Sequence, residues 1–250
     1  MLVAVAGVVL AANVPATAVA NGEDAPDGAH PFVARLSMPE IVRGDGSRYA
    51  SECTGALVAP QWVITAGHCL HDGDRNRISG TPRYPVLAVL GRDRRSGSGG
   101  TTAEVVRVVQ NPVTDVALVE LAEPVGSIEP LEVRTEEPEQ GDEVLLAGWG
   151  STDGNADLAG RPEHLQTAEF QVTRTTPTEA FIEATGPDLL TSACPGDSGA
   201  PFLTDEDSPE LVATEISGPT CPHSSEETAA RADVLAEWIA AETGAGEARE

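Results

Sequence analysis

The sequence predicts an all-β fold that is completed by one C-terminal helix. Two observations lead to this class: short β-branched segments recur between Gly, Pro, Asp and Asn residues along most of the chain, and helical spacing of apolar residues appears only near its end. A chain of 250 residues with 40% hydrophobic content is also long enough to bury one large core or two small ones. The predicted strands are residues 56–58, 62–65, 86–90, 105–109, 116–121 and 144–147.

The segments between and after these strands have the composition of connections, except for the last one. Residues 92–101 and 151–160 predict surface loops, and residues 129–142, which are polar and contain two prolines, predict a linker between two halves. From residue 233 to 242, four apolar residues recur at helical spacing, which predicts an amphipathic helix that docks on the body, followed by a frayed tail at 244–250.

The N-terminal sequence indicates that the protein is exported to an oxidising environment. Residues 2–12 are almost wholly apolar, and Ala16-Thr17-Ala18 follows as a small-x-small cleavage pattern, so residues 1–18 are interpreted as a signal peptide. The usual basic n-region is missing. The alternative is a buried first strand, because the apolar run is too short to span a membrane. We therefore expect a secreted, extracellular protein without a stable membrane anchor.

The charge of the chain limits its partners. The formal net charge is −25, the pI is about 4.3, and every one of the 15 basic side chains is an arginine. Such an acidic chain is not expected to bind nucleic acid. Self-repulsion keeps it soluble and favours a monomer, and the alternative role of the charge is to attract cationic substrates.

The four cysteines form two well-separated pairs, Cys53 with Cys69 and Cys194 with Cys221. They lack the CxxC spacing of a zinc site, so disulfides are the better interpretation and no metal is expected. Three pairings are formally available, of which the local one closes two short loops.

A candidate nucleophile lies in Gly196-Asp197-Ser198-Gly199, directly after Cys194-Pro195. A serine hydroxyl is a poor nucleophile unless a base takes its proton, and flanking glycines permit a tight backbone that exposes it. The N–H groups of Gly196 and Ser198 can then hold a developing oxyanion. Taken alone, this string is equally consistent with a plain loop.

A base and an orienting carboxylate occur earlier in the chain. His68 follows an apolar strand and precedes Cys69, which can fix its backbone through a disulfide. Asp115 stands at the head of another apolar strand, where a histidine N–H would stabilise its buried charge; a turn residue is the alternative. The remaining histidines are interpreted as structural or exposed: His30, His71, His164 and His223.

Together these strings resemble the chymotrypsin/trypsin family of serine proteases, in its secreted bacterial type. The order His68, Asp115, Ser198 matches that family, and Val19-Ala20-Asn21-Gly22 and Gly148-Trp149-Gly150 resemble further family motifs. The resemblance implies two six-stranded antiparallel β-barrels, residues 19–128 with His68 and Asp115 and residues 129–232 with Ser198 and the specificity pocket, and then a helix at 233–243.

The resemblance also implies the chemistry. Ser198 would attack the scissile carbonyl, His68 would act as general base and acid, and Asp115 would orient His68, without any cofactor. Gly196 and Ser198 would form the oxyanion hole. The cysteines would pair locally, as Cys53–Cys69 and Cys194–Cys221.

The family's activation step points to Val19 and Asp197. In the family, the α-ammonium released by processing pairs with the aspartate before the nucleophile, here Asp197. Because the preceding Ala16-Thr17-Ala18 is also the best signal-peptidase site, we hypothesise that one cleavage both removes the signal and activates the enzyme, with no separate propeptide. An unprocessed chain would not show this ion pair.

The specificity pocket departs from the family pattern. Ser192 stands where trypsins carry an aspartate, and Glu227 aligns with a pocket-wall glycine. Glu227 would recognise Arg or Lys at P1, or shorten the pocket, or point outward in an acidic loop. The pocket wall at Ser217 and Gly218 belongs to a segment, 214–218, that lacks the family's tryptophan and whose register is ambiguous. Gly67, where alanine is commoner, is expected to have little consequence.

The expected function is therefore a secreted serine endopeptidase that acts on protein or peptide substrates, with protein inhibitors as further partners. Two alternatives stay open: a catalytically silent binding protein on the same scaffold, and an esterase with the same nucleophile.

Overall fold

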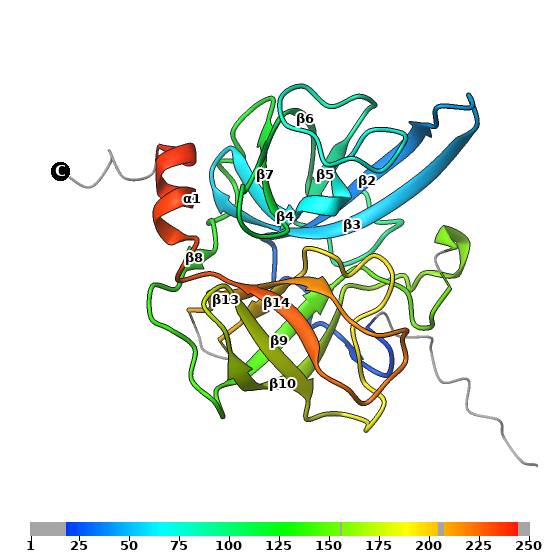
Figure 1. The fold of residues 1–250 in the computed structure, drawn as a ribbon. Helices are drawn as coiled ribbons and strands as arrows, with labels where there is room; N and C mark the ends of the chain where they lie inside the picture. The colour runs from blue at the N-terminus through cyan, green and yellow to red at the C-terminus, as the bar shows by residue number, and fades with distance from the viewer. Residues whose placement is uncertain (1–18, 156, 205–207, 245–250) are drawn as a thin grey trace, which may run out of the picture.

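Two closed β-sheets make up the computed structural model, which describes residues 19–155, 157–204 and 208–244. The N-terminal barrel has the strand order β2-β3-β4-β7-β6-β5, with every neighbouring pair antiparallel (Figure 1). Its strands are β2 (Val33–Val42), β3 (Arg48–Ala59), β4 (Trp62–Ala66), β5 (Leu87–Leu90), β6 (Thr101–Gln110) and β7 (Val116–Leu121).

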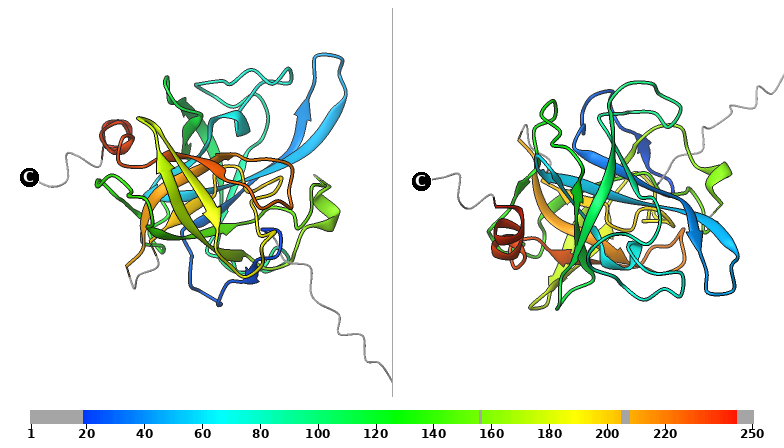
Figure 2. Two further views of the ribbon diagram at one scale, coloured as in Figure 1. Left: turned by 60° about the horizontal axis from the view of Figure 1, so that its bottom comes forward. Right: turned by 90° about the horizontal axis from the view of Figure 1, so that it is seen from above.

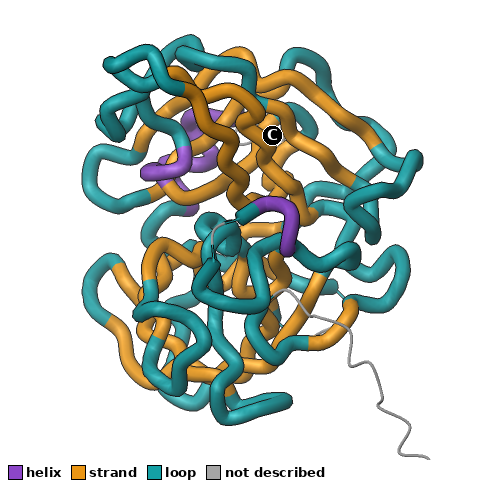
Figure 3. The backbone as a smooth tube through the Cα atoms, turned by 90° about the vertical axis from the view of Figure 1, so that its right-hand side faces the viewer, coloured by secondary structure: helices purple, strands orange, loops and turns teal. Residues whose placement is uncertain are grey.

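The C-terminal barrel lies below the first in Figure 1 and closes where β9 pairs with both β10 and β12. Its strands are β9 (Glu143–Gly148), β10 (Gln166–Thr175), β11 (Glu179–Ala184), β12 (Pro201–Leu203), β13 (Glu210–Ser217) and β14 (Glu227–Arg231). Two short strands are added at its rim: β1 (Glu23–Asp24) pairs with β10, and β8 (Glu132–Val133) lies parallel to β13. Figure 3 shows the strands gathered in two lobes, with loops around and between them.

Each barrel encloses side chains rather than a channel. All five residues of β4 are buried, and β7 is buried except at Glu120, as expected for strands inside a small closed barrel. In the C-terminal barrel, Phe170 and Phe202 are buried and meet edge to face with ring centroids 5.4 Å apart. The cores therefore fix the strand ends that carry the candidate catalytic residues.

The C-terminal helix α1 (Ala236–Thr243) lies beside the N-terminal barrel, as all three ribbon views show (Figures 1 and 2). Leu235 and Ile239 are buried and join the hydrophobic cluster that contains the core of that barrel. The helix ends at Gly244, whose φ of 70° is left-handed. The helix begins at Ala236, three residues after the expected start at residue 233, and Asp233 instead forms an ion pair with Arg231.

The predicted fold class, two six-stranded antiparallel barrels with a C-terminal helix, is confirmed. The expected signal peptide at residues 1–18 lies outside the described residues, as does nearly all of the expected tail. The segment 129–142 connects the barrels and contains β8. Among the described residues, no helix is long and apolar enough to cross a membrane.

Candidate active site

His68 lies at the end of a rigid segment of the N-terminal barrel. The buried strand β4 leads into a single 3-10 turn, η1 (Gly67–Cys69), and Cys69 is bonded to Cys53 on β3, which confirms the first predicted disulfide. The His68 side chain is 43% exposed, and its Nδ1 lies 2.7 Å from Oδ2 of Asp115. The turn therefore presents the imidazole to the cleft with one nitrogen already engaged.

Asp115 is placed by the turn before β7. The side chain of Asn111 accepts hydrogen bonds from the N–H groups of Val113 and Thr114, which shapes this turn. The backbone carbonyl of Asp115 accepts a hydrogen bond from the N–H of Gly67 at 2.8 Å. The two segments that carry His68 and Asp115 are thus joined through their backbones as well as their side chains.

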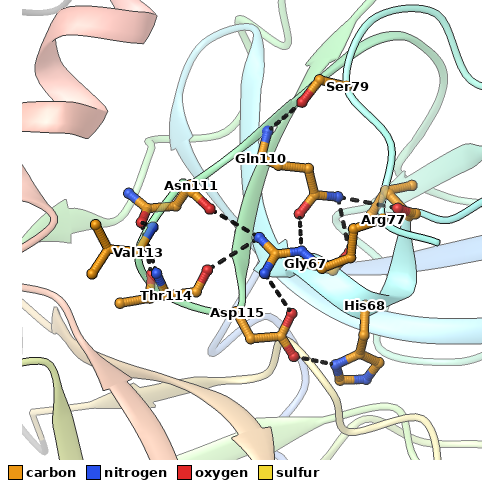
Figure 4. Close-up of polar contacts among 10 residues, drawn as sticks. Gly67, His68, Arg77, Ser79, Gln110, Asn111, Val113, Thr114 and Asp115 are labelled. Atoms are coloured by element: carbon orange, nitrogen blue, oxygen red, sulfur yellow. Dashed lines mark hydrogen bonds and ion pairs between the residues drawn. The ribbon is translucent and has the colours of Figure 1, made fainter.

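The electrostatics of Asp115 favour its ionised form. Burial raises the pKa of Asp115, but the hydrogen bond and charge of His68, together with the charge of Arg77, outweigh burial and leave the pKa below its usual range. Figure 4 shows the two partners on opposite sides of the carboxylate.

Ser198 lies in a loop whose shape depends on glycine. Gly196 and Gly199 have φ values of 102° and 86°, which residues with a Cβ rarely adopt. A Cβ at Gly196 would collide with the guanidinium of Arg161, and one at Gly199 would collide with Thr65 and the backbone of Thr54. The disulfide Cys194–Cys221, also as predicted, anchors the start of this loop.

Thr54, on β3 of the N-terminal barrel, holds the nucleophile loop of the opposite barrel. Its N–H donates to the carbonyl of Ser198 at 3.0 Å, and its hydroxyl donates to the carbonyl of Gly196 at 2.8 Å. The same hydroxyl accepts a hydrogen bond from the N–H of Trp149. Within the described parts of the chain, the N–H groups of Gly196 and Ser198 donate to no protein acceptor. Their expected role as an oxyanion hole stays a prediction.

Asp197 is fully buried behind the nucleophile. Its carboxylate accepts hydrogen bonds from the N–H groups of Gly150 at 2.7 Å and Cys194 at 3.0 Å. Any Cβ at Gly148 or Gly150 would collide with this carboxylate, which explains the Gly-Trp-Gly motif. Burial raises the pKa of Asp197 to about 6, even though the charges of Arg161 and Arg95 act to lower it.

The segment expected to supply an ammonium partner for Asp197 lies nearby in the C-terminal barrel. Val19 is fully buried in the same hydrophobic cluster as core residues of this barrel, and Ala20 forms backbone hydrogen bonds with Ser192 in both directions. The nitrogen of Val19 is a peptide nitrogen here because residue 18 precedes it. The expected ion pair between an α-ammonium at Val19 and Asp197 therefore stays a prediction.

One cavity of about 560 Å³ brings the candidate residues together between the barrels. Its lining includes His68, Asp115 and Ser198, and also the specificity positions Ser217, Gly218 and Glu227. Three stretches that are distant in sequence therefore meet in one cleft. A cleft of this size suits a ligand the size of a few residues.

Glu227 closes one end of this cavity. Its side chain is buried in β14, so the outward-pointing alternative is wrong. Oε1 accepts the N–H of Ala193 at 2.7 Å, and Oε2 lies against Gly218 where a Cβ would be. Burial raises the pKa of Glu227 to about 8. His223 Nε2 lies 3.2 Å from Oε1, but burial lowers the pKa of His223, so the contact is not an ion pair at neutral pH.

Ser192, the expected pocket floor, is fully buried, and its hydroxyl accepts the N–H of His223. Among the described residues it does not line the cavity, because the Glu227 carboxylate binds the adjacent Ala193 and covers this end. In segment 214–218, the pairing of β13 with β14 has a bulge between Glu215 and Ser217, and Glu215 is buried.

Two charged residues at the site were not singled out from the sequence. Glu215 lines the cavity, and burial together with the charges of Glu227 and Asp197 raises its pKa well above the usual value. Arg77 approaches Asp115 from outside the cleft. The one sequence signal for Arg77 was Gly67, whose missing Cβ makes the room that the arginine occupies. No group of His, Cys, Asp and Glu in the described part of the chain could hold a metal ion.

Comparison with known proteins agrees with this geometry. A family model described as Trypsin matches residues 19–239. A trypsin of Saccharopolyspora erythraea is 29% identical over 225 residues, which cover 81% of this chain and 88% of that protein. Human serine protease 56 is 29% identical over 216 residues, 76% of this chain, but the chain spans only 32% of that longer protein.

Solved structures show the same fold. Mouse neuropsin, described as a serine protease expressed in the limbic system of the brain, superposes with a TM-score of 0.70. The match covers 90% of this chain and 99% of neuropsin at 19% identity, so the likeness concerns the fold alone.

Proposed function

The chain belongs to the trypsin family of serine proteases, and from this membership we propose that it is a secreted serine endopeptidase that hydrolyses peptide bonds through an acyl-enzyme. The observation that carries the proposal is the single cleft lined by His68, Asp115 and Ser198, with the imidazole 2.7 Å from the carboxylate. Secretion is supported by the two disulfides and by the apolar N-terminal sequence.

The proposed roles follow the geometry. His68 takes the proton of the Ser198 hydroxyl as Oγ attacks the carbonyl, and Asp115 stabilises the imidazolium that forms. The N–H groups of Gly196 and Ser198 receive the oxyanion, an interaction worth about 3 kcal/mol per donor. The imidazolium then protonates the leaving amine, and water repeats the sequence on the acyl-enzyme. These steps need no cofactor.

We propose that processing before Val19 completes the site. The freed ammonium would pair with Asp197, which now has only backbone donors and a raised pKa. An ion pair there would hold Asp197 ionised and fix the adjacent oxyanion loop.

Glu227 is our candidate for recognising the P1 side chain. Its buried Oε2 faces the Gly218 wall of the cavity, and a P1 guanidinium or ammonium would supply the charge that this carboxylate lacks. The competing proposal is that the Glu227 side chain only shortens the pocket and selects small P1 residues.

Labelling with a fluorophosphonate tests the catalytic proposal. The processed protein should become covalently labelled and Ser198→Ala should not, at equal thermal stability. Labelling that is absent from the processed wild type, or that survives in Ser198→Ala, would leave a silent binding protein or another nucleophile as the explanation. Cleavage of a peptide library, as opposed to small esters alone, separates a peptidase from an esterase.

The same library tests P1 specificity. Cleavage after Arg and Lys should fall sharply in Glu227→Gly, since the buried carboxylate is lost. Glu226→Gly is the matched control, because Glu226 is partly exposed and paired with Arg174 away from the cavity. An unchanged profile in Glu227→Gly would end the proposal, and a new preference for larger P1 residues would favour the short-pocket alternative.

A further inference from the structure

The guanidinium of Arg77 is fixed beside the loop that carries Asp115 (Figure 4). Its Nε donates to Oε1 of Gln110 at 2.7 Å, and its Nη2 donates to the carbonyls of Asn111 at 3.0 Å and Thr114 at 3.1 Å. Arg77 comes from the connection between η1 and β5, so its side chain must reach across to the turn before β7. A planar group with three acceptors has a defined position.

This position aims the remaining guanidinium nitrogen at the catalytic carboxylate. Nη1 of Arg77 lies 3.6 Å from Oδ1 of Asp115, while His68 binds the other oxygen, Oδ2, at 2.7 Å. Oδ1 is buried, although the Asp115 side chain as a whole is 31% exposed. The carboxylate is therefore held between a base on the cleft side and a permanent cation behind it.

Gly67 makes this arrangement sterically feasible. A Cβ at position 67 would lie 2.6 Å from Oε1 of Gln110, 2.7 Å from Oδ1 of Asp115 and 2.8 Å from Cζ of Arg77. Such distances are shorter than carbon atoms tolerate, so a side chain at position 67 would displace the guanidinium or the carboxylate. Gly67 was expected to have little consequence, but the space that it leaves is where three functional groups converge.

Gln110 ties the network back to the histidine turn. Its Nε2 donates to the carbonyls of Gly67 at 2.9 Å and Leu70 at 3.1 Å, while its Oε1 accepts from Arg77. Arg77 is therefore coupled to both ends of the His68–Asp115 pair.

We propose that Arg77 is a positioning residue that holds the Asp115 carboxylate ionised and correctly oriented toward His68, and that Gly67 leaves the space for its guanidinium. This proposal rests on the proposed function. Two groups face Asp115, the imidazole of His68 from η1 and the guanidinium of Arg77 from the following loop, and the acidic Glu215 and Glu227 line the same cavity. A purely structural Arg77, which only binds the carbonyls of residues 111 and 114, would not influence how the pair titrates.

The experiment compares Arg77→Ala and Arg77→Lys with the processed wild type on an amide substrate across pH. Removing the cation makes the surroundings of His68 more negative. The acid limb of the pH profile of kcat/KM should therefore move up by about half a pH unit, and kcat should fall about fivefold with KM unchanged. Arg77→Lys keeps the charge and should retain the acid limb of the wild type. Arg107→Ala, which removes an exposed arginine paired with Glu120, is the matched control.

The results separate the possibilities. An Arg77→Ala variant with the wild-type profile and kcat would overturn the proposal, and so would equal losses in the alanine and lysine variants without a shift in pH. If the wild type fails to react with fluorophosphonate, the proposed function fails, but the proton between His68 and Asp115 can still be followed by NMR. Its signal should change at higher pH in Arg77→Ala than in wild type, and identical behaviour would again refute the role of Arg77.

Gly67→Ala tests the steric part. It should cause at least the losses of Arg77→Ala, because the new Cβ meets both Cζ of Arg77 and Oδ1 of Asp115, and adding Arg77→Ala to it should cause little further loss. Additive losses would show that Gly67 acts independently of Arg77 and would overturn the coupling.

Discussion

Two carboxylates of the N-terminal barrel and two of the C-terminal barrel have different partners. In the N-terminal barrel, Asp115 faces Arg77, and Glu52, which is 8% exposed, is bound by Arg35 at 2.7 Å and Arg95 at 2.6 Å. In the C-terminal barrel, Asp197 and Glu227 accept hydrogen bonds from backbone N–H groups, and burial raises their pKa values to about 6 and about 8. Among the described residues, Asp115 and Glu52 each have an arginine within 4 Å, whereas Asp197 and Glu227 have none.

This difference marks Asp197 and Glu227 as the carboxylates that would bind a cation other than an arginine of this chain. A buried carboxylate without a cation is costly, and natural proteins keep such groups mainly where a function uses them. For Asp197 the missing cation would be the ammonium of a new N-terminus, and for Glu227 it would be a basic substrate side chain. Three variants test whether the contrast between the barrels has this meaning.

The largest effect is expected at Asp197. Asp197→Asn removes the charge that the new ammonium would meet, and losing one partner of a buried pair costs about 3–5 kcal/mol, so activity should fall by about 10²- to 10³-fold. The measurement is kcat/KM of processed protein whose N-terminus has been sequenced, with thermal unfolding as the control for folding. Full activity, or a mature chain that starts well before Val19, would contradict the activation proposal.

A smaller effect of pH is expected from Glu227. Because its folded pKa is raised above the ordinary value of 4.5 to about 8, the folded state holds a proton that the unfolded state releases. The stability that this proton confers is complete below pH 4.5 and is lost as pH rises toward 8. Glu227→Gln should therefore gain stability relative to wild type as pH rises from 4.5 to 8, and the two proteins should be equally stable at pH 4.

Denaturant unfolding at a series of pH values checks this, with the exposed Glu226→Gln as the control. If the wild type shows the same pH dependence as Glu227→Gln, folding does not raise the pKa of the Glu227 carboxyl. The contrast between the barrels would then not extend to the specificity pocket.

The smallest effect, with the opposite sign, is expected in the N-terminal barrel. Glu52→Gln leaves Arg35 and Arg95 without their shared anion, so it should destabilise the protein by about 1.5 kcal/mol at pH 8. The two substitutions remove the same charge, and equilibrium unfolding should report a loss for one and a gain for the other. Changes of the same sign would mean that the difference between the barrels is not electrostatic.

Much of the fold and site was predictable because it depends on local pattern. The strands that flank His68 and Asp115 are continuous β-branched runs, and they occur as β4 and β7. By contrast, β10 and β11 carry many polar residues on their outer faces and gave no clear signal, and β2 has the same mixed character. Their positions follow from barrel closure, which is a tertiary constraint.

The site residues that the sequence missed depend on contacts between distant segments. Arg77 meets Asp115 only after β6 and β7 have paired, and no local pattern marks an arginine in a polar loop. Glu215 is buried next to a bulge in the pairing of β13 with β14, and neither feature could be read from segment 214–218. The departures from the family pattern, at positions 67 and 227, were visible, but their meaning required the neighbours in space.

The hydrogen bonds of Thr54 make the reactivity of Ser198 a property of both halves of the chain at once. Since β3 holds the carbonyls of Gly196 and Ser198 from across the interface, any slippage of one barrel against the other deforms the nucleophile loop while both cores remain intact. Inactivation by heat or denaturant should consequently precede the loss of β-sheet signal, and covalent labelling of Ser198 becomes a sensitive reporter of how firmly the halves are docked.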